Sequence, residues 1–284
     1  MDAAKVPPPP PYSASDAPIS SQPVPEGAAQ SKEQTAIVQG TVALLSPLIG
    51  LDKVKFKQSV EWLQIVCGVE MPIHFELANQ FDSVIYRLQE DTDCCTRNFI
   101  PQGFRTDSTV LAVNGVPAFR FQREGRCVMN CCMPCCCYPL PFSRERLTVT
   151  AANGTVLGVV QQEWSCWTSR FSILNAEGSV ILGINGPPLN FACFYDINYE
   201  IVALDGTRIG NITKHYAGFC CDTFADFDDF TIDFPSDLDA TVKATLLGAV
   251  SLINLLFFQG SIRRLACALV CGISRTAIDL KLMK

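Results

Sequence analysis

The sequence predicts a mainly β protein, a sandwich or a barrel of about a dozen short strands, with an apolar helix near the C-terminus. Apolar and polar residues alternate through much of the chain after residue 50, as expected for strands with one buried face. Residues 244–262 include no charged side chain, which predicts the helix. Four turn pairs separate strand-like runs: Asn114-Gly115, Asn153-Gly154, Glu177-Gly178 and Asp205-Gly206.

Composition limits the classes of function. The 284 residues are 48% hydrophobic and 18% charged, enough to bury a full core. A formal charge of -6 argues against nucleic acid as the main ligand, because an acidic surface repels phosphate. The first residues lack the apolar stretch of a signal peptide, so we expect a cytosolic chain whose thiols stay reduced.

Residues 1–50 hold half of the 18 prolines and are expected to form a disordered or polyproline-II tail. Within this tail, Pro9, Pro10, Pro11 and Tyr12 form a Pro-Pro-x-Tyr sequence. A preformed polyproline-II segment loses little entropy when it docks on a WW or SH3 domain, so such domains are candidate partners. A bare linker is the alternative.

Strands are expected from about Lys53 onward. The Asn-Gly and Asp-Gly pairs favour two-residue type I′ turns, since these residues tolerate positive φ angles. Glu177-Gly178 is a weaker turn signal of the same kind. The runs with period two are Val54 and Phe56; Phe75 and Leu77; Val84, Tyr86 and Leu88; Tyr195, Ile197, Tyr199 and Ile201; and Phe230, Ile232 and Phe234.

The apolar helix has two interpretations. A helix that is apolar on all sides must be buried in protein or in lipid. Its length could just cross a hydrocarbon core of roughly 30 Å, and a helix sealed inside a β-barrel fits equally well. Residues 260–284 follow as an extension with five basic residues, one acidic residue and a second apolar run, which suits contact with anionic lipid.

Signatures of catalysis are missing from the sequence. It has no Gly-x-x-x-x-Gly-Lys phosphate loop, no Gly-x-Gly-x-x-Gly and no His-Glu-x-x-His. The two histidines, His74 and His215, are interpreted as structural residues. We therefore do not expect an enzyme.

A cysteine cluster calls for a separate explanation. Cys132 and Cys135 have the spacing of half a zinc site, but a second well-spaced pair is missing. Reduced cysteines flanked by proline and apolar residues suit S-acylation, and a plain cysteine-rich loop also remains open. The candidate acylation sites are Cys131, Cys132, Cys135, Cys136 and Cys137.

An acidic segment offers the oxygen ligands that calcium prefers. Its carboxylates belong to Asp226, Asp228, Asp229, Asp233 and Asp237. The spacing departs from an EF-hand, so we expect weak affinity, in the range of about 10⁻⁴–10⁻³ M. A solvated strand face is the alternative, because the apolar residues between the acids alternate like a strand.

The order of these elements resembles the phospholipid scramblase family. The resemblance rests on the Pro-rich tail, the segment 90–98, the Cys-Cys-x-Pro-Cys-Cys-Cys run, the segment 234–239 and the apolar helix, and it covers roughly residues 51–259. It implies a tubby-like fold, a closed antiparallel barrel of twelve strands around a hydrophobic helix at 240–259. The family view also treats that helix as a membrane anchor, a role that conflicts with burial inside a barrel.

The family's calcium segment corresponds to 226–237, and its palmitoylated cysteines correspond to the cluster at 131–137. The family's nuclear-import stretch corresponds to 210–216, which keeps only Lys214 as a firm positive charge, so nuclear entry is not expected. The resemblance thus implies calcium and covalent palmitate as the bound groups.

The predicted function is calcium-dependent, ATP-independent, bidirectional scrambling of membrane phospholipids at the cytosolic face of the plasma membrane. Other membranes, the cytoplasm and a homo-oligomer are left open. The alternative is a membrane-tethered, lipid-binding adaptor without transport; a zinc-dependent nuclear regulator ranks third. A polar path along the barrel exterior would favour scrambling, whereas a compact basic pocket would favour the adaptor.

Overall fold

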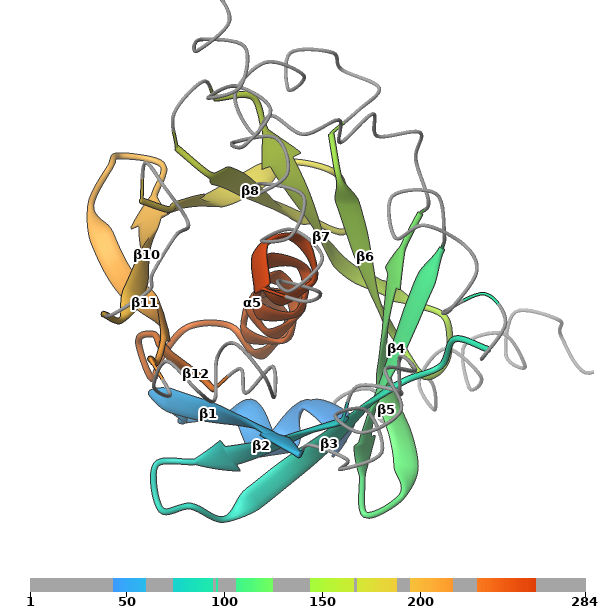
Figure 1. Ribbon diagram of the computed structural model, residues 1–284. Helices are drawn as coiled ribbons and strands as arrows, with labels where there is room; N and C mark the ends of the chain where they lie inside the picture. Colours follow the sequence, from blue (N-terminus) through green and yellow to red (C-terminus); the bar gives the residue numbers. More distant parts are fainter. Residues whose placement is uncertain are drawn as a thin grey trace, which may run out of the picture. The chain divides into compact units, whose positions relative to one another are not determined.

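The computed structural model describes residues 43–59, 74–93, 96, 106–124, 144–165, 168–187, 195–216 and 229–258. These residues form a closed antiparallel barrel in which strands adjacent in sequence are also neighbours, and the first strand pairs with the last (Figure 1). The predicted fold class is confirmed. The strands are β1 (Lys53–Ser59), β2 (His74–Asn79), β3 (Val84–Glu90), β4 (Asp107–Val113), β5 (Val116–Arg123), β6 (Arg146–Ala151), β7 (Val156–Glu163), β8 (Arg170–Asn175), β9 (Val180–Asn185), β10 (Ile197–Ala203), β11 (Arg208–Lys214) and β12 (Phe230–Asp233).

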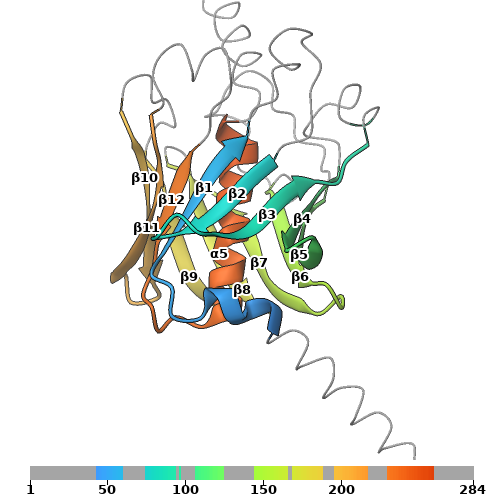
Figure 2. The same ribbon diagram turned by 90° about the horizontal axis from the view of Figure 1, so that it is seen from below.

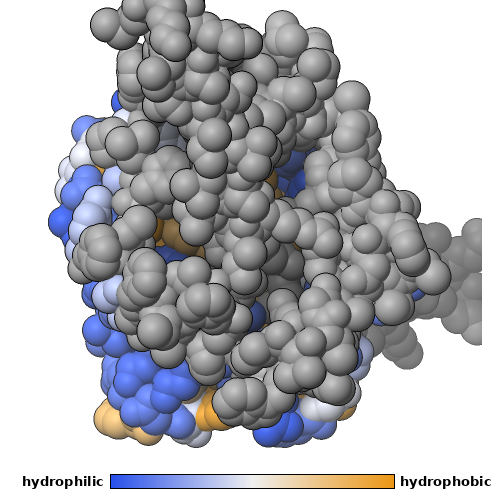
Figure 3. All heavy atoms as spheres, in the orientation of Figure 1, coloured by the Kyte–Doolittle hydropathy of each residue, from blue (hydrophilic) through white to orange (hydrophobic). Residues whose placement is uncertain are grey.

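Side chains alternate between the barrel interior and the exterior. On β10, Ile197, Tyr199 and Ile201 are buried, while Asn198 and Glu200 between them are exposed. Where Figure 3 colours the surface, blue, hydrophilic residues predominate, with some orange, hydrophobic areas. The strand predicted to begin with Tyr195 starts later in the structure, because β10 begins at Ile197 and Tyr195 is 64% exposed.

The four predicted turns are hairpins, but only one is the expected two-residue type. Asn114 and Gly115 both have positive φ, 50° and 82°, as a type I′ turn requires. In each of the other three pairs only the glycine has positive φ. Their glycine N–H groups donate to a carbonyl three residues earlier, so these are longer loops that close with a glycine.

The apolar segment forms helix α5 (Ala240–Ile253), which continues as the π-helical turn η3 (Asn254–Phe258). Asp239 caps the helix by accepting a hydrogen bond from the backbone N–H of Thr241 at 2.8 Å. The helix runs along the barrel axis (Figure 2), and 67% of its most apolar stretch is buried. By length and composition alone it could also cross a membrane.

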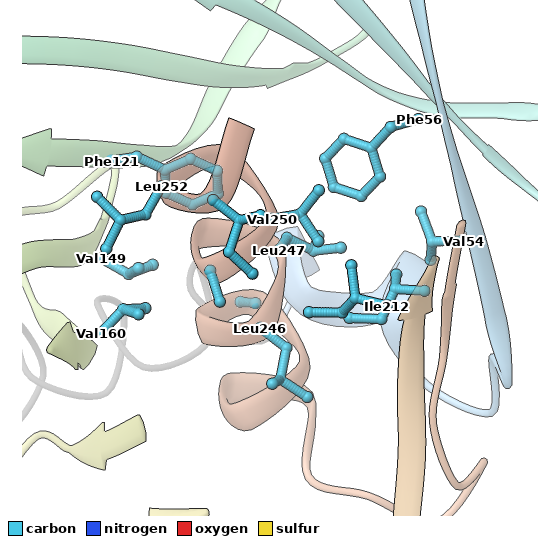
Figure 4. Close-up of a cluster of buried hydrophobic side chains, with 14 of the residues drawn as sticks. Val54, Phe56, Phe121, Val149, Val160, Ile212, Leu246, Leu247, Val250 and Leu252 are labelled. Carbon is cyan, nitrogen blue, oxygen red and sulfur yellow. The ribbon is translucent and has the colours of Figure 1, made fainter. Parts of the chain in front are cut away.

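Glycines bring α5 close to one side of the barrel wall. A Cβ atom on Gly158 of β7 would lie 2.5 Å from Oγ1 of Thr245, and one on Gly248 of the helix would lie 2.7 Å from Cγ2 of Val149. Real Cβ atoms essentially never lie so close to a neighbour, so a larger residue at either position would force neighbouring atoms to shift. Figure 4 shows the resulting contacts, with helix side chains packed between Val149 and Val160 on one side and Ile212 on the other.

Candidate functional site

The two ends of the barrel differ in their connections. Five hairpins close one end, after β2, β4, β6, β8 and β10. At the other end, each of the six connections between strands includes residues outside the described ranges. We call these the hairpin end and the connection end. Helix α5 begins at the hairpin end, and η3 finishes at the connection end.

Most predicted site residues lie outside the described residues. This holds for the five cysteines at 131–137, for Asp226 and Asp228, and for the tail sequence 9–12. The cysteine segment joins β5 to β6, and the two aspartates precede β12, so both attach to strands at the connection end. Their roles remain predictions.

The three described aspartates of the acidic segment are not brought together. Oδ1 of Asp229 accepts a hydrogen bond from the backbone N–H of Gln58 at 3.3 Å, whereas Asp233 pairs with Lys53 at 3.0 Å. A strand rises about 3.3 Å per residue, so these two carboxylates are separated by roughly 13 Å along β12. Asp237 follows in the turn before α5. Within the described ranges, no three His, Cys, Asp or Glu side chains are grouped to hold a metal ion.

His215 joins three strand ends beside the acidic segment. Its Nδ1 lies 3.0 Å from Asp196, and its Nε2 lies 2.7 Å from the hydroxyl of Thr231. The backbone N–H of Tyr216, and then His215, lower the pKa of Asp196 by hydrogen bonding to its carboxylate. The contacts of the His215 ring with Asp196 and Thr231 therefore support the structural role that we expected for this histidine.

A buried ion cluster at the connection end was missed by sequence reasoning. Arg123, which is 2% exposed, donates to Asp107 at 2.6 Å and to Glu145 at 2.9 Å. The three residues lie at the start of β4, at the end of β5 and just before β6. Because buried charges are stable only when they are paired, the cluster holds these three parts of the chain together. Alternation within β5 could have suggested that Arg123 faces inward, but not which acids it meets.

Lys243 forms a second buried charge site, at the hairpin end. Its Nζ donates to the carbonyl oxygens of Leu51 and Ser236 at 2.8 Å and of Leu48 at 3.3 Å. Burial lowers the pKa of this ammonium group, while nearby aspartates oppose the shift. The first turn of the helix is thereby connected to two chain segments outside it.

Lys214 is also turned inward. It is 7% exposed, and its Nζ lies 5.0 Å from the centroid of the Phe258 ring. The one firm positive charge of the stretch 210–216 is therefore mostly hidden from solvent.

A polar groove of about 610 Å³ lies on the outer wall over β2, β3 and β4. Its lining includes charged and polar side chains, among them Glu76, Arg87, Gln89 and Asp91, and reaches Pro117 beside the β4–β5 hairpin. Cations and carboxylates are mixed in this lining. The groove on the barrel exterior therefore has a mixed polar and apolar lining, and it is not a compact basic pocket.

A closed barrel filled by an apolar helix defines a tubby-like β-barrel protein. The Scramblase family model matches residues 31–260, and the chain belongs to this family. Phospholipid scramblase 2 of Bos taurus is 34% identical over 216 residues, which cover 76% of this chain and 71% of that protein. Human phospholipid scramblase 1 is 33% identical over 76% of this chain and 66% of its own length. Human phospholipid scramblase family member 5 is 33% identical over 77% of this chain and 78% of its own length. No solved structure matches the chain.

Proposed function

We propose that the protein moves phospholipids between the two leaflets of a membrane. The observation that carries this proposal is the family match, which covers the whole barrel and its helix. The similar proteins are named phospholipid scramblases. The activity is lipid translocation without bond chemistry, and the sequence has no phosphate loop to couple it to ATP.

The groove supports transport over simple binding. A headgroup that crosses a membrane needs polar contacts along a path, and mixed charges suit zwitterionic lipids better than a single basic pocket does. The groove extends from the hairpin beside Pro117 up the wall to Asp91 at the connection end. Its length thus follows the strands.

Calcium is proposed as the regulator, through the acidic segment that holds Asp226, Asp228, Asp229, Asp233 and Asp237. Calcium would neutralise carboxylates that otherwise repel anionic headgroups. Because Asp229 immediately precedes β12 and Asp233 ends it, one ion would use ligands from one end of the strand only. Asp229 borders the connection that holds Asp226 and Asp228, so we place the ion there.

Membrane attachment is proposed through palmitate on the cysteines of 131–137, at the cytosolic face of the plasma membrane. Each buried methylene contributes about 0.8 kcal/mol, so several acyl chains give firm anchoring.

The tail sequence 9–12 would recruit WW or SH3 domain proteins.

A lipid-binding adaptor without transport is the second candidate. It is favoured by the position of α5, whose residues from Lys243 to Val250 are buried inside the barrel. An interior helix does not span a bilayer. In this case the barrel would bind lipid from the membrane surface.

A vesicle assay separates the two functions. Purified protein is incorporated into vesicles with fluorescent lipid in both leaflets, and dithionite then bleaches the lipid that it can reach, with and without calcium. Scrambling gives bleaching beyond half. Bleaching that stays at half, with incorporation verified, would reject scrambling and leave the adaptor.

The same assay tests the calcium segment with two variants. The first carries Asp226→Ala, Asp228→Ala, Asp229→Ala, Asp233→Ala and Asp237→Ala, and we expect it to lose the calcium response. The matched control carries Glu177→Ala and Glu200→Ala, which remove exposed acids elsewhere on the barrel. An equal loss in both variants would show a general charge effect instead of a calcium site.

A further inference from the structure

The groove lies over the stretch in which β3 pairs with β4. Strands β3 and β4 pair only from Arg87 to Glu90, opposite Thr109 to Ala112, and the register shifts between Leu111 and Ala112 where β4 meets β5. Strand β3 continues its pairing with β2 as far as Val84. The groove of about 610 Å³ covers the paired stretch, where the outward side chains of Arg87, Gln89, Val110 and Ala112 line it.

Opposite charges are placed side by side within the groove. Nε of Arg87 donates to Oε1 of Glu76 at 3.2 Å across β2 and β3, and Arg87 is 75% exposed. Further along, Asp91 accepts a hydrogen bond from Arg120 at 3.4 Å. Gln89 stands beside Arg87 on the outer face of β3 and adds a neutral donor and acceptor. The groove therefore offers both a cation and carboxylates.

The other side of the groove is apolar. Val110 and Ala112 face outward from β4 and are partly exposed, and Pro117 continues this surface at the start of β5. By strand register, Ala112 lies directly opposite Arg87. A ligand that contacts Arg87 would therefore also meet an apolar strip.

We propose that this groove binds the zwitterionic headgroup and the upper acyl segment of a phospholipid. The guanidinium of Arg87 would contact the phosphate, Glu76 the positively charged amine, and the strip at Val110, Ala112 and Pro117 the glycerol and first methylenes. The headgroup presents the same pair of opposite charges as the Arg87–Glu76 ion pair, so it can replace that pair without leaving a charge unmatched. This inference rests on the proposed function, because it names the part of the wall that contacts the transported lipid.

Opening the ion pair is inexpensive. Exposed ion pairs contribute little to stability, typically about 0–1 kcal/mol, because water solvates both partners. Arginine also binds phosphate through two parallel hydrogen bonds, a geometry that a single bond to Glu76 does not use. Exchange of Glu76 for a phosphate as the partner of Arg87 therefore costs little.

Titration calorimetry of the full chain tests the inference without vesicles. The probe is dihexanoylphosphatidylcholine below its micelle concentration, compared with glycerophosphocholine, which lacks acyl chains, and with inorganic phosphate. We expect the lipid to bind more tightly than glycerophosphocholine, and phosphate to bind least. Phosphate binding as tight as lipid binding would overturn the assignment in favour of a simple anion site.

Two charge reversals locate the site. Arg87→Glu should weaken lipid binding by about tenfold or more, as expected for loss of a charge-assisted contact. Arg208→Glu is the matched control, because Arg208 forms an equivalent exposed cross-strand pair with Glu200, at 3.3 Å, outside the groove. Equal weakening in both variants, or none in Arg87→Glu, would overturn the proposal. Since no leaflet exchange is measured, a protein that binds here but fails to scramble would refute the proposed function and leave this site intact.

Discussion

The ammonium nitrogen of Lys243 lies 2.8 Å from the carbonyl oxygen of Leu51. This contact joins the first turn of the core helix to the segment that leads into the barrel. Together with two further carbonyls and the Phe234 ring, 5.2 Å away, it holds the buried ammonium group in place. The helix is thus held in place by a specific polar contact as well as by apolar packing.

Replacing this lysine should destabilise the fold. Lys243→Met preserves the apolar stem but leaves buried carbonyls without their donor, so we expect a loss of about 2–3 kcal/mol in the free energy of unfolding. Urea unfolding measures it. Lys53→Met is the control, since its ion pair with Asp233 is partly exposed and should contribute less than about 1 kcal/mol. Equal losses would contradict a special role for Lys243.

Gly158→Ala tests the close approach of helix and wall. The added methyl would collide with Thr245 and with the carbonyl oxygen of Leu174, which is backbone and cannot move aside. We expect about 1–3 kcal/mol of destabilisation, as in other overpacked cores, and a lower melting temperature. At Gly183 the nearest atom is a flexible side-chain carbon of Val202, at 3.1 Å, so Gly183→Ala should cost less. A larger loss at Gly183 would refute the packing argument.

The helix cap should respond to pH. Hydrogen bonds from Thr241 lower the pKa of Asp239 in the folded state. The stabilisation by the charged cap is therefore complete above about pH 4, the unfolded pKa, and disappears as pH falls through the lower folded pKa. Asp239→Ala should cost about 1 kcal/mol at pH 7. The stability difference from Asp239→Asn should shrink between pH 7 and pH 3, and a constant difference would contradict this mechanism.

The buried ion cluster should be sensitive to loss of its cation. Arg123→Met removes the cation that pairs with the buried Asp107 and Glu145, and breaking a buried ion pair in this way typically costs about 3–5 kcal/mol. Arg120 lies on the same strand but faces solvent and pairs with Asp91. Arg120→Met should therefore cost under about 1 kcal/mol. Chemical denaturation compares the two, and equal stabilities would show that the cluster does not support the fold.

Much of the fold could be predicted from the sequence because it depends on local rules. Alternation identified β10 and β12, and the glycines of the turn pairs identified the hairpins. The type of turn could not be predicted, since it depends on how each pair of strands is aligned. At Asn153-Gly154 a register shift between Val149 and Thr150 accommodates the longer loop.

The candidate sites were harder to predict because they depend on contacts distant in the chain. Arg123 and Glu145 are 22 residues apart, and Lys243 meets a carbonyl 192 residues away. The acidic segment was predicted to bring its aspartates together around calcium. Asp229 and Asp233 are nevertheless far apart, because residues that are close in sequence are spread out along an extended chain. The groove likewise is lined by residues of four strands, β2 to β5, and cannot be predicted from any one of them.

Amide hydrogen exchange of β6 and β7 in vesicle-bound protein, under conditions in which lipids are scrambled, tests the account most directly. These strands pack against α5 through Val149 and Val160, so their protection reports whether the helix stays inside the barrel. We predict that both strands exchange as slowly as in the protein free in solution. Fast exchange in β6 and β7, with α5 still protected by lipid, would show that the helix leaves the barrel and would contradict a barrel that works with its core in place.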